Sequence, residues 1–381
     1  MKLPEKEMLK NIDYPFVLAL LAILGLSIAV MPSAAAAVSG ATDHAALHMR
    51  FILGGLVVML FVLAVDYSQW QSYSKYLYVF TIMMLFLVIF SGLGGGGVQR
   101  WMEIGSFRFQ PSELAKLLTI IAFADFLTKR QGKLENLKQF LPCFVFIGVP
   151  TLLIFMQPDL GTALVFIAIL FGMMFIAGAN VKLLVGLFTG GLAAAIGVIY
   201  AHVRLLAEFD RGILPLRDYQ IDRLTSFLDP HADPAGAGFH IIQSQIAIGS
   251  GGLTGQGLFQ GPQTHLNFIP EHHTDFIFSV VGEELGFIGA VIILVLYFFL
   301  IYRCINIMAQ AKDMFGILIV AGITSMLLFH ILVNVGMTIG IMPITGIPLP
   351  LFSYGGTSMI TNLLALGIVL SIGMRRKKLT F

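Results

Sequence analysis

The sequence predicts an all-α, polytopic integral membrane protein. Hydrophobic residues make up 57% of the 381 positions and charged residues only 12%, about half the charged share of a soluble domain. The apolar residues gather in runs close to the ~20 residues that a transmembrane helix needs. These runs predict about ten spans, at residues 14–31, 51–66, 75–92, 112–128, 139–156, 160–177, 181–202, 276–302, 314–335 and 357–374.

The first apolar run, 14–31, has a second interpretation. It is followed by Ser33 and a run of alanines, a pattern that also fits a cleaved signal peptide. We favour a retained helix, because three carboxylates dilute the basic segment expected before a signal sequence: Glu5, Glu7 and Asp13. The second run is short, and only Gln157-Pro158-Asp159 separates the fifth run from the sixth.

Lysine and arginine in the loops predict the orientation, because cytoplasmic loops are enriched in both. With the N-terminus placed inside, fifteen basic residues fall on the inner side: Lys2, Lys6, Lys10, Lys75, Lys129, Arg130, Lys133, Lys138, Lys182, Arg303, Lys312, Arg375, Arg376, Lys377 and Lys378. Seven fall outside: Arg50, Arg100, Arg108, Arg204, Arg211, Arg217 and Arg223. We therefore expect a multi-pass cytoplasmic-membrane protein with both termini in the cytoplasm.

The whole chain, 1–381, is predicted to form one membrane domain without a tandem repeat or a soluble domain. Its largest loop, 203–274, lies outside the membrane between spans seven and eight, and short amphipathic helices are expected in it. A second outer loop, 93–111, contains four consecutive glycines. A third, 340–356, is apolar but interrupted by three prolines, and such backbone is tolerated at membrane depth only against protein or a wet cavity.

Asp275 lies where the largest loop meets the eighth span. An ionisable residue at the mouth of a membrane helix is a functional candidate, and Asp275 could act as a general base in an outward-facing cavity. The alternative is a structural N-cap of the span. Glu283 and Glu284, two turns deeper, are expected to face the bundle interior rather than lipid.

A second charged pair, Glu113 and Lys116, follows Pro111 at the start of the fourth span. Residues three apart share one face of a helix and can form an ion pair. The pair is either a structural lock of the bundle or a site where Lys116 meets an anionic headgroup while Glu113 holds it. Because charge inside a span is costly, we expect the pair to line a cavity.

Other polar residues lie at the outer ends of the predicted spans. Asp159 fits an N-cap of span six. Arg100, Arg108 and Arg223 could contact phosphate, to which a guanidinium is well suited, although for each one alone a solvated loop charge is the favoured interpretation.

Several other classes of site are weakly supported. The glycine run lacks the Lys-Ser/Thr of a phosphate-binding loop and is interpreted as a hinge. His265, His272 and His273 with Asp275 give no closed metal-ligand set, and the two cysteines give neither a disulfide framework nor a metal site. No Gly-x-Ser-x-Gly nucleophile motif and no basic-aromatic pattern for nucleic acid occur.

Four motifs appear in order along the chain, at residues 110–116 (QPSELAK), 157–162 (QPDLGT), 268–276 (FIPEHHTDF) and 348–356 (PLPLFSYGG). With the ten spans and one large outer loop, they resemble the SEDS family (shape, elongation, division and sporulation) over nearly the whole chain. The segment 339–348 is more similar to the elongation branch than to the division branch, in which a lysine is expected where Thr345 stands.

The resemblance implies a peptidoglycan glycosyltransferase for cell elongation and rod shape. It would polymerise lipid II into β-1,4 glycan strands outside the membrane and release undecaprenyl pyrophosphate. The essential carboxylate of the family falls on Asp275 and the conserved membrane pair on Glu113 and Lys116. The expected substrate-binding residues are Glu113, Lys116, Arg100, Gln157, Asp159, Arg223, Glu271, His273 and Ser353.

The resemblance also implies partners, namely a class B penicillin-binding protein that crosslinks the strands and further membrane proteins of the elongation complex. A divalent cation, Mg²⁺ or Mn²⁺, is the candidate cofactor for neutralising the leaving pyrophosphate. Two other functions stay open. A lipid II flippase would use Glu113, Lys116, Glu283 and Glu284 as a polar path, and a scaffold would only activate a partner synthase.

Overall fold

The computed structural model describes residues 11–36, 41–91, 100–105, 107–209, 218–232, 236–266, 268–269 and 272–376. The expected Glu271 lies outside these ranges. The long helices are α2 (Tyr14–Ala35), α3 (Ala41–Ala64), α4 (Tyr67–Ser91), α5 (Pro111–Thr128), α6 (Leu137–Met156), α7 (Leu160–Ile176), α8 (Val181–Phe209), α12 (Ile277–Ala309), α13 (Met314–Thr338) and α14 (Gly356–Met374).

Each of the ten predicted spans coincides with one of these helices, which confirms the all-α membrane fold. Within the described ranges, eight helices are long and apolar enough to cross a membrane. The other two are α7, which has 17 residues, and α5, which carries Glu113, Lys116 and Asp125. The starts of α3 and α4 were predicted wrongly, at residues 51 and 75 instead of Ala41 and Tyr67, because polar residues are frequent in the first turns of both helices.

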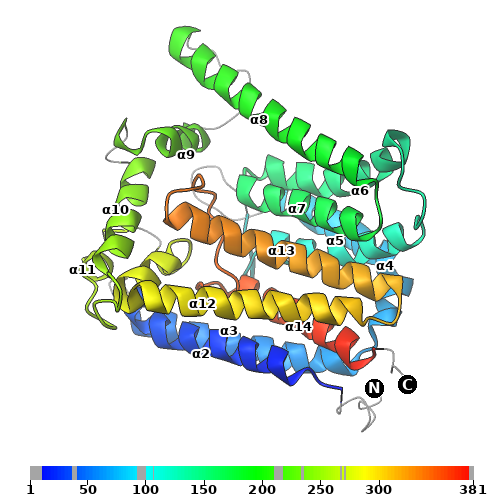
Figure 1. The fold of residues 1–381 in the computed structure, drawn as a ribbon, viewed down its shortest axis with the longest axis horizontal. Coiled ribbons are helices and arrows are strands. Elements are labelled where there is room, and N and C mark those ends of the chain that lie inside the picture. Colours follow the sequence, from blue (N-terminus) through cyan, green and yellow to red (C-terminus); the bar gives the residue numbers. More distant parts are fainter. Residues whose placement is uncertain are drawn as a thin grey trace.

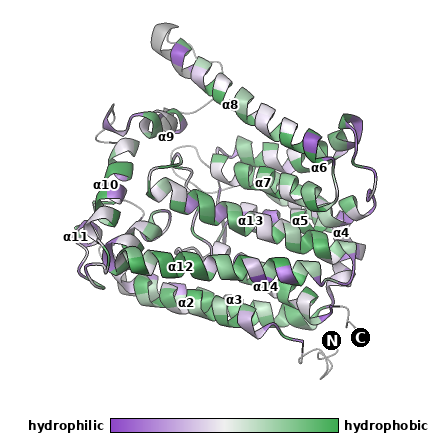
Figure 2. Ribbon diagram, in the orientation of Figure 1, coloured by the Kyte–Doolittle hydropathy of each residue, from purple (hydrophilic) through white to green (hydrophobic). Residues whose placement is uncertain are grey.

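The long helices pack side by side into one bundle, and only α8 slants away from it (Figure 1). Helices α13 and α14 form the centre of the bundle. In their apolar, membrane-spanning stretches, 72% and 83% of the residues are buried, against 6% in α8. The long helices are coloured mostly as hydrophobic, and hydrophilic residues concentrate at the helix ends and connections (Figure 2). The apolar exposed surface of the bundle is therefore suited to lipid.

The two ends of the bundle differ. At one end, called here the terminal end, the Asn11 side chain donates a hydrogen bond to the Met374 carbonyl at 3.4 Å. The opposite end, called the loop end, carries the short helices of the largest loop (Figure 1), which are α9 (Asp218–Leu228), η1 (Pro230–Ala232), α10 (Ala237–Ser250) and α11 (Pro262–His265). The prediction of short helices in this loop is confirmed.

A small hairpin, formed by β1 (Met102–Ile104) and β2 (Phe107–Phe109), precedes α5. Its strands are antiparallel, with Met102 opposite Phe109. The sequence did not predict this hairpin, because three-residue strands leave too short an alternating pattern to be recognised.

Helix α12 is interrupted at Gly286, whose φ of 66° and ψ of −165° are not helical. The segment 251–257 packs against this break. Its backbone donates from Gln256 to the Glu283 carbonyl and from Gly257 to the Glu284 carbonyl, both at 3.0 Å. Backbone groups that the break would leave unpaired are thus satisfied by a neighbouring segment, as burial in a membrane protein requires. The prediction of one uninterrupted helix for this span, 276–302, is therefore wrong at Gly286.

Candidate active site

Asp275 lies in the turn before α12, at the loop end, and its side chain is half-buried. The helix begins at Ile277, and Phe276 occupies the N-cap position. The alternative interpretation of Asp275 as the N-cap of this span is therefore wrong.

The turn that carries Asp275 is fastened to the proline-rich segment 343–354. Asn334 of α13 donates hydrogen bonds from one amide nitrogen to the carbonyls of Asp275, at 2.7 Å, and Ile347, at 2.8 Å. The Ser353 hydroxyl donates to the Thr274 carbonyl at 2.6 Å. Side chains from α13 and the proline-rich segment thus fix the backbone on which the Asp275 carboxylate is mounted.

Arg223 of α9 and Asp275 meet at Gly346. A β-carbon placed on Gly346 would lie 3.3 Å from Arg223 Nη1 and 3.3 Å from Asp275 Oδ2. The two charged atoms are therefore no more than twice that distance apart. A guanidinium from the largest loop and a carboxylate from the turn that follows this loop converge at a position without a side chain.

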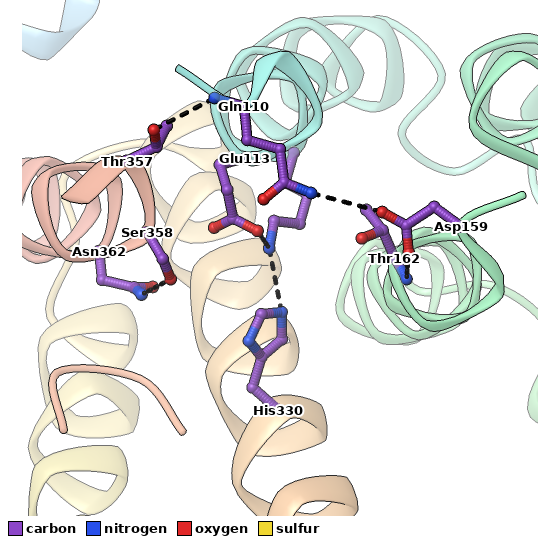
Figure 3. A network of polar contacts seen from close by, with 9 residues as sticks. Gln110, Glu113, Asp159, Thr162, His330, Thr357, Ser358 and Asn362 are labelled. Atoms are coloured by element: carbon purple, nitrogen blue, oxygen red, sulfur yellow. Dashed lines mark hydrogen bonds and ion pairs between the residues drawn. The ribbon is translucent and has the colours of Figure 1, made fainter. Parts of the chain in front are cut away.

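The second predicted pair is also formed. Lys116 Nζ lies 2.8 Å from Glu113 Oε1, and the two side chains are only 2% and 6% exposed. His330 of α13 joins them, with its Nε2 3.2 Å from Lys116 Nζ (Figure 3). The pair therefore ties α5 to α13 in the bundle interior, as expected of a structural lock, and it is closed to solvent in this structure.

A separate set of polar contacts beside this pair connects the start of α5 to α7 and α14 (Figure 3). The Gln110 side chain donates to Asp159 Oδ2 at 3.5 Å, and its backbone N–H donates to the Thr357 hydroxyl at 3.2 Å. Asp159 caps α7 by accepting from the Thr162 backbone N–H at 3.2 Å, which confirms the predicted N-cap. The start of α5 is thereby linked to two neighbouring helices.

The other candidates have mainly structural partners. Arg100 donates from Nε to the Gln157 carbonyl at 3.1 Å and also bonds the Pro158 carbonyl, so it holds the turn between α6 and α7. The Gln157 side chain is buried and donates to the Leu85 carbonyl at 2.9 Å. Arg108 is exposed and paired with Glu103 at 3.0 Å in the hairpin.

An aromatic cluster of His44, His273 and Tyr354 lies beside the Asp275 turn. The His273 ring centroid is 5.6 Å from that of His44 and 5.7 Å from that of Tyr354. The Tyr354 backbone N–H donates to the His273 carbonyl at 2.9 Å, and burial raises the pKa of the Tyr354 phenol. Among the described residues, no three His, Cys, Asp or Glu side chains gather closely enough to hold a metal ion.

Glu283 and Glu284 are buried, as predicted, and they bind the largest loop. Glu283 accepts hydrogen bonds from the backbone N–H groups of Gln263, at 2.7 Å, and Thr264, at 3.0 Å. Glu284 accepts from Ser33 and from the Phe259 backbone N–H. Their partners are distinct from those of Glu113 and Lys116, so the four residues do not form one polar path.

Three residues of this site were not predicted from the sequence: Asn334, His330 and Gly346. Two of them carried a signal, since His330 and Asn334 are polar residues one turn apart in an otherwise apolar span, and such residues face the bundle interior. Gly346 gave no signal, because a glycine beside prolines is typical of any loop.

A bundle of apolar helices with buried charged groups and an Asp–Arg site at one end defines a polytopic membrane protein with a polar site built between its helices. The sequence model of the FtsW/RodA/SpoVE family, described as cell cycle protein, matches residues 12–378. The chain belongs to this family, and the resemblance to the SEDS proteins is confirmed.

Relatives with assigned activities match along nearly their whole length. The chain is 40% identical to peptidoglycan glycosyltransferase MrdB of Escherichia coli, over 97% of this chain and 95% of the relative. It is 34% identical to peptidoglycan glycosyltransferase RodA of Treponema pallidum, over 96% and 98%.

Two solved structures share the fold. RodA of Thermus thermophilus is 28% identical, with a TM-score of 0.70 over 96% of this chain and 98% of that one. A chain from a study of polymerization and crosslinking by a peptidoglycan synthase complex is 30% identical, with a TM-score of 0.79 over 96% and 99%.

Proposed function

We propose that this protein is a peptidoglycan glycosyltransferase that polymerises lipid II for cell elongation, with Asp275 as its general base. The observation that carries the assignment of the base is the meeting of Asp275 and Arg223 at Gly346. Near-full-length relatives named for this activity support the reaction class. The entire chain, 1–381, acts as one membrane domain.

The reaction needs one base and one stabilised leaving group. Asp275 removes the proton from the 4-hydroxyl of the acceptor GlcNAc. This oxygen bonds to C1 of the donor MurNAc while the bond from C1 to the pyrophosphate breaks, so undecaprenyl pyrophosphate leaves. An α-linked donor that gives a β-1,4 product is inverted at C1, and no covalent enzyme intermediate is needed.

Arg223 is the cation that approaches the proposed base at Gly346. Its planar guanidinium suits pyrophosphate oxygens, and a positive group there stabilises the charge that develops on the leaving group. Lys116 and Glu113 have a structural part in this proposal, because with His330 they hold α5 against α13 in the bundle interior. Because the described residues offer no three-ligand metal set, no step is assigned to a cation.

The loop end is proposed to face outward, where lipid II is polymerised, with both termini in the cytoplasm. The excess of basic residues at the terminal end supports this orientation. We propose a class B penicillin-binding protein as the partner that crosslinks the product, together with other membrane proteins of the elongation complex. The structural similarity to a chain from a peptidoglycan synthase complex supports this partner.

The test is glycan synthesis by the purified full-length protein supplied with lipid II. Asp275→Asn removes the base while keeping the shape of the side chain, so polymer formation is expected to fall to background. Asp222→Asn is the matched control, because Asp222 is exposed on the neighbouring α9 and should retain wild-type activity. Polymer made by folded Asp275→Asn protein would refute the assignment of the base.

The same preparations separate the two other functions. Vesicles with lipid II only in the inner leaflet would reveal a flippase as lipid movement without polymer. A scaffold would yield polymer only when a partner with its own transferase domain is added. The structure does not favour the flippase, since the acidic residues of its suggested path have separate partners.

A further inference from the structure

A pocket lies at the terminal end of the bundle, far along α4 and α5 from the proposed active site. Its volume is about 480 Å³, and its lining consists of Gln71, Ser72, Ser74, Lys75, Tyr76, Val79 and Lys129. The first six belong to the opening turns of α4, and Lys129 follows the last residue of α5. The pocket thus opens where two membrane helices reach the water interface.

The pocket carries a net positive charge. Lys75 is exposed and has no ion-pair partner among the residues that the structure describes. Lys129 contacts Asp125 at 2.5 Å, yet its side chain remains 59% exposed. Asp125 is itself buried and accepts hydrogen bonds from Gln71 at 3.1 Å and Ser74 at 2.7 Å. Two lysines therefore lie at the pocket against one carboxylate, that of Asp125, which is buried behind the lining residues.

Beyond the pocket, the same face of α4 becomes apolar. Tyr76 and Val79 line the pocket and are exposed, and Met83 and Phe90 continue the exposed stripe along the helix. Tyrosine is typical of the membrane interface. A molecule that fits this surface has an anionic head beside the lysines and an apolar tail along α4, which a free phosphate ion does not have.

We propose that this pocket binds an anionic phospholipid of the cytoplasmic leaflet, with its phosphodiester between Lys75 and Lys129 and an acyl chain along Val79 and Met83. Basic pockets between membrane helices on the cytoplasmic side are suited to such headgroups. The leaflet follows from the proposed orientation, whereas binding itself does not depend on the enzymatic activity.

Native mass spectrometry of the purified full chain tests the proposal. Dioleoyl phosphatidylglycerol should be retained by the wild type, whereas dioleoyl phosphatidylcholine should be retained much less. Lys75→Gln should weaken phosphatidylglycerol binding about fivefold, the effect of one basic residue near a membrane surface. Because Lys75 has no ion-pair partner in the described chain, this variant should fold normally, and unchanged glycan synthesis would confirm the fold.

Lys312→Gln is the matched control, since Lys312 is an exposed lysine between α12 and α13 that does not line the pocket. It should bind phosphatidylglycerol like the wild type. Equal retention by Lys75→Gln and the wild type would overturn the proposal. Complete displacement of the lipid by an equal concentration of inorganic phosphate would also overturn it, because the site would then recognise a free anion.

Discussion

Asn334 and Asp275 are joined by a hydrogen bond of 2.7 Å from the Asn334 amide to the Asp275 carbonyl. The same nitrogen donates to the Ile347 carbonyl at 2.8 Å. Asn334 is fully buried in α13, so a central helix sets the position of both the proposed base and the segment that faces it. Asn334 acts through Asp275 and is therefore a positioning residue.

Replacing Asn334 with leucine should slow glycan synthesis more than it weakens substrate binding. The change leaves two carbonyls without their donor, which costs about 1–3 kcal/mol, and displaces a base whose misplacement by about 1 Å can cost on the order of a hundredfold in rate. We expect kcat to fall by at least tenfold with KM nearly unchanged, measured with purified protein and lipid II.

Ser371→Ala is the control for this loss, because it removes two partly buried hydrogen bonds at the terminal end. The Ser371 hydroxyl donates to the Val65 carbonyl at 3.3 Å and accepts from Arg375. This change should lower thermal stability while leaving kcat unchanged. A kcat for Asn334→Leu equal to that of Ser371→Ala would show that Asn334 does not position the base.

Gly346→Ala should impair the Asp–Arg site. Gly346 has a φ of 72°, and its new β-carbon would press on Asp275 and Arg223 at 3.3 Å. Gly178 has a φ of 83° with nothing within 4 Å, so Gly178→Ala introduces similar backbone strain, about 1 kcal/mol, without a collision. Both variants should lose stability, and only Gly346→Ala should lose most of its polymerising activity. Equal activities would contradict this arrangement.

The membrane spans were predictable because lipid imposes one rule along the whole chain. Every backbone polar group must be satisfied within its helix, so an apolar run of sufficient length already specifies the element. Local chemistry was also sufficient for the Asp159 cap and the pairing of Glu113 with Lys116, since their partners lie three residues away.

The rest of the site depends on contacts between distant segments. Asn334 and Asp275 are 59 residues apart, and the break at Gly286 is completed by a segment about 30 residues earlier. The role of Ser353 also depends on a distant segment. Its hydroxyl donates to the Thr274 carbonyl and accepts from the Leu349 N–H. The sequence motif marked Ser353 as important but gave no indication that it fastens two loops together.

The pair of Glu113 and Lys116 should show strong energetic coupling. Removing one charge leaves the other buried, which costs about 3–5 kcal/mol, so Glu113→Gln and Lys116→Met should each strongly destabilise the protein. The double variant should lose less than the sum of the two, by about 0.5–3 kcal/mol. Denaturant unfolding of the four proteins in detergent measures this difference.

The exposed pair of Glu103 and Arg108, 3.0 Å apart, is the comparison for this cycle. A surface pair contributes about 0–1 kcal/mol, so its two single changes should be nearly neutral and additive. If the losses of stability caused by Glu113→Gln and Lys116→Met were also additive, the stability of the bundle would not depend on this ion pair.

Gly255→Ala should detach the segment 251–257 from the break in α12. Gly255 has a φ of 80°, and a β-carbon there would stand 2.1 Å from the Glu284 carbonyl oxygen, a backbone atom that cannot move aside. Gly252 is the matched control, because it has a φ of 53° and open space around its β-carbon position. Hydrogen exchange should show lost protection at the Gln256 and Gly257 amides in Gly255→Ala only. Full protection of both amides in that variant would show that the segment does not depend on the close approach at Gly255.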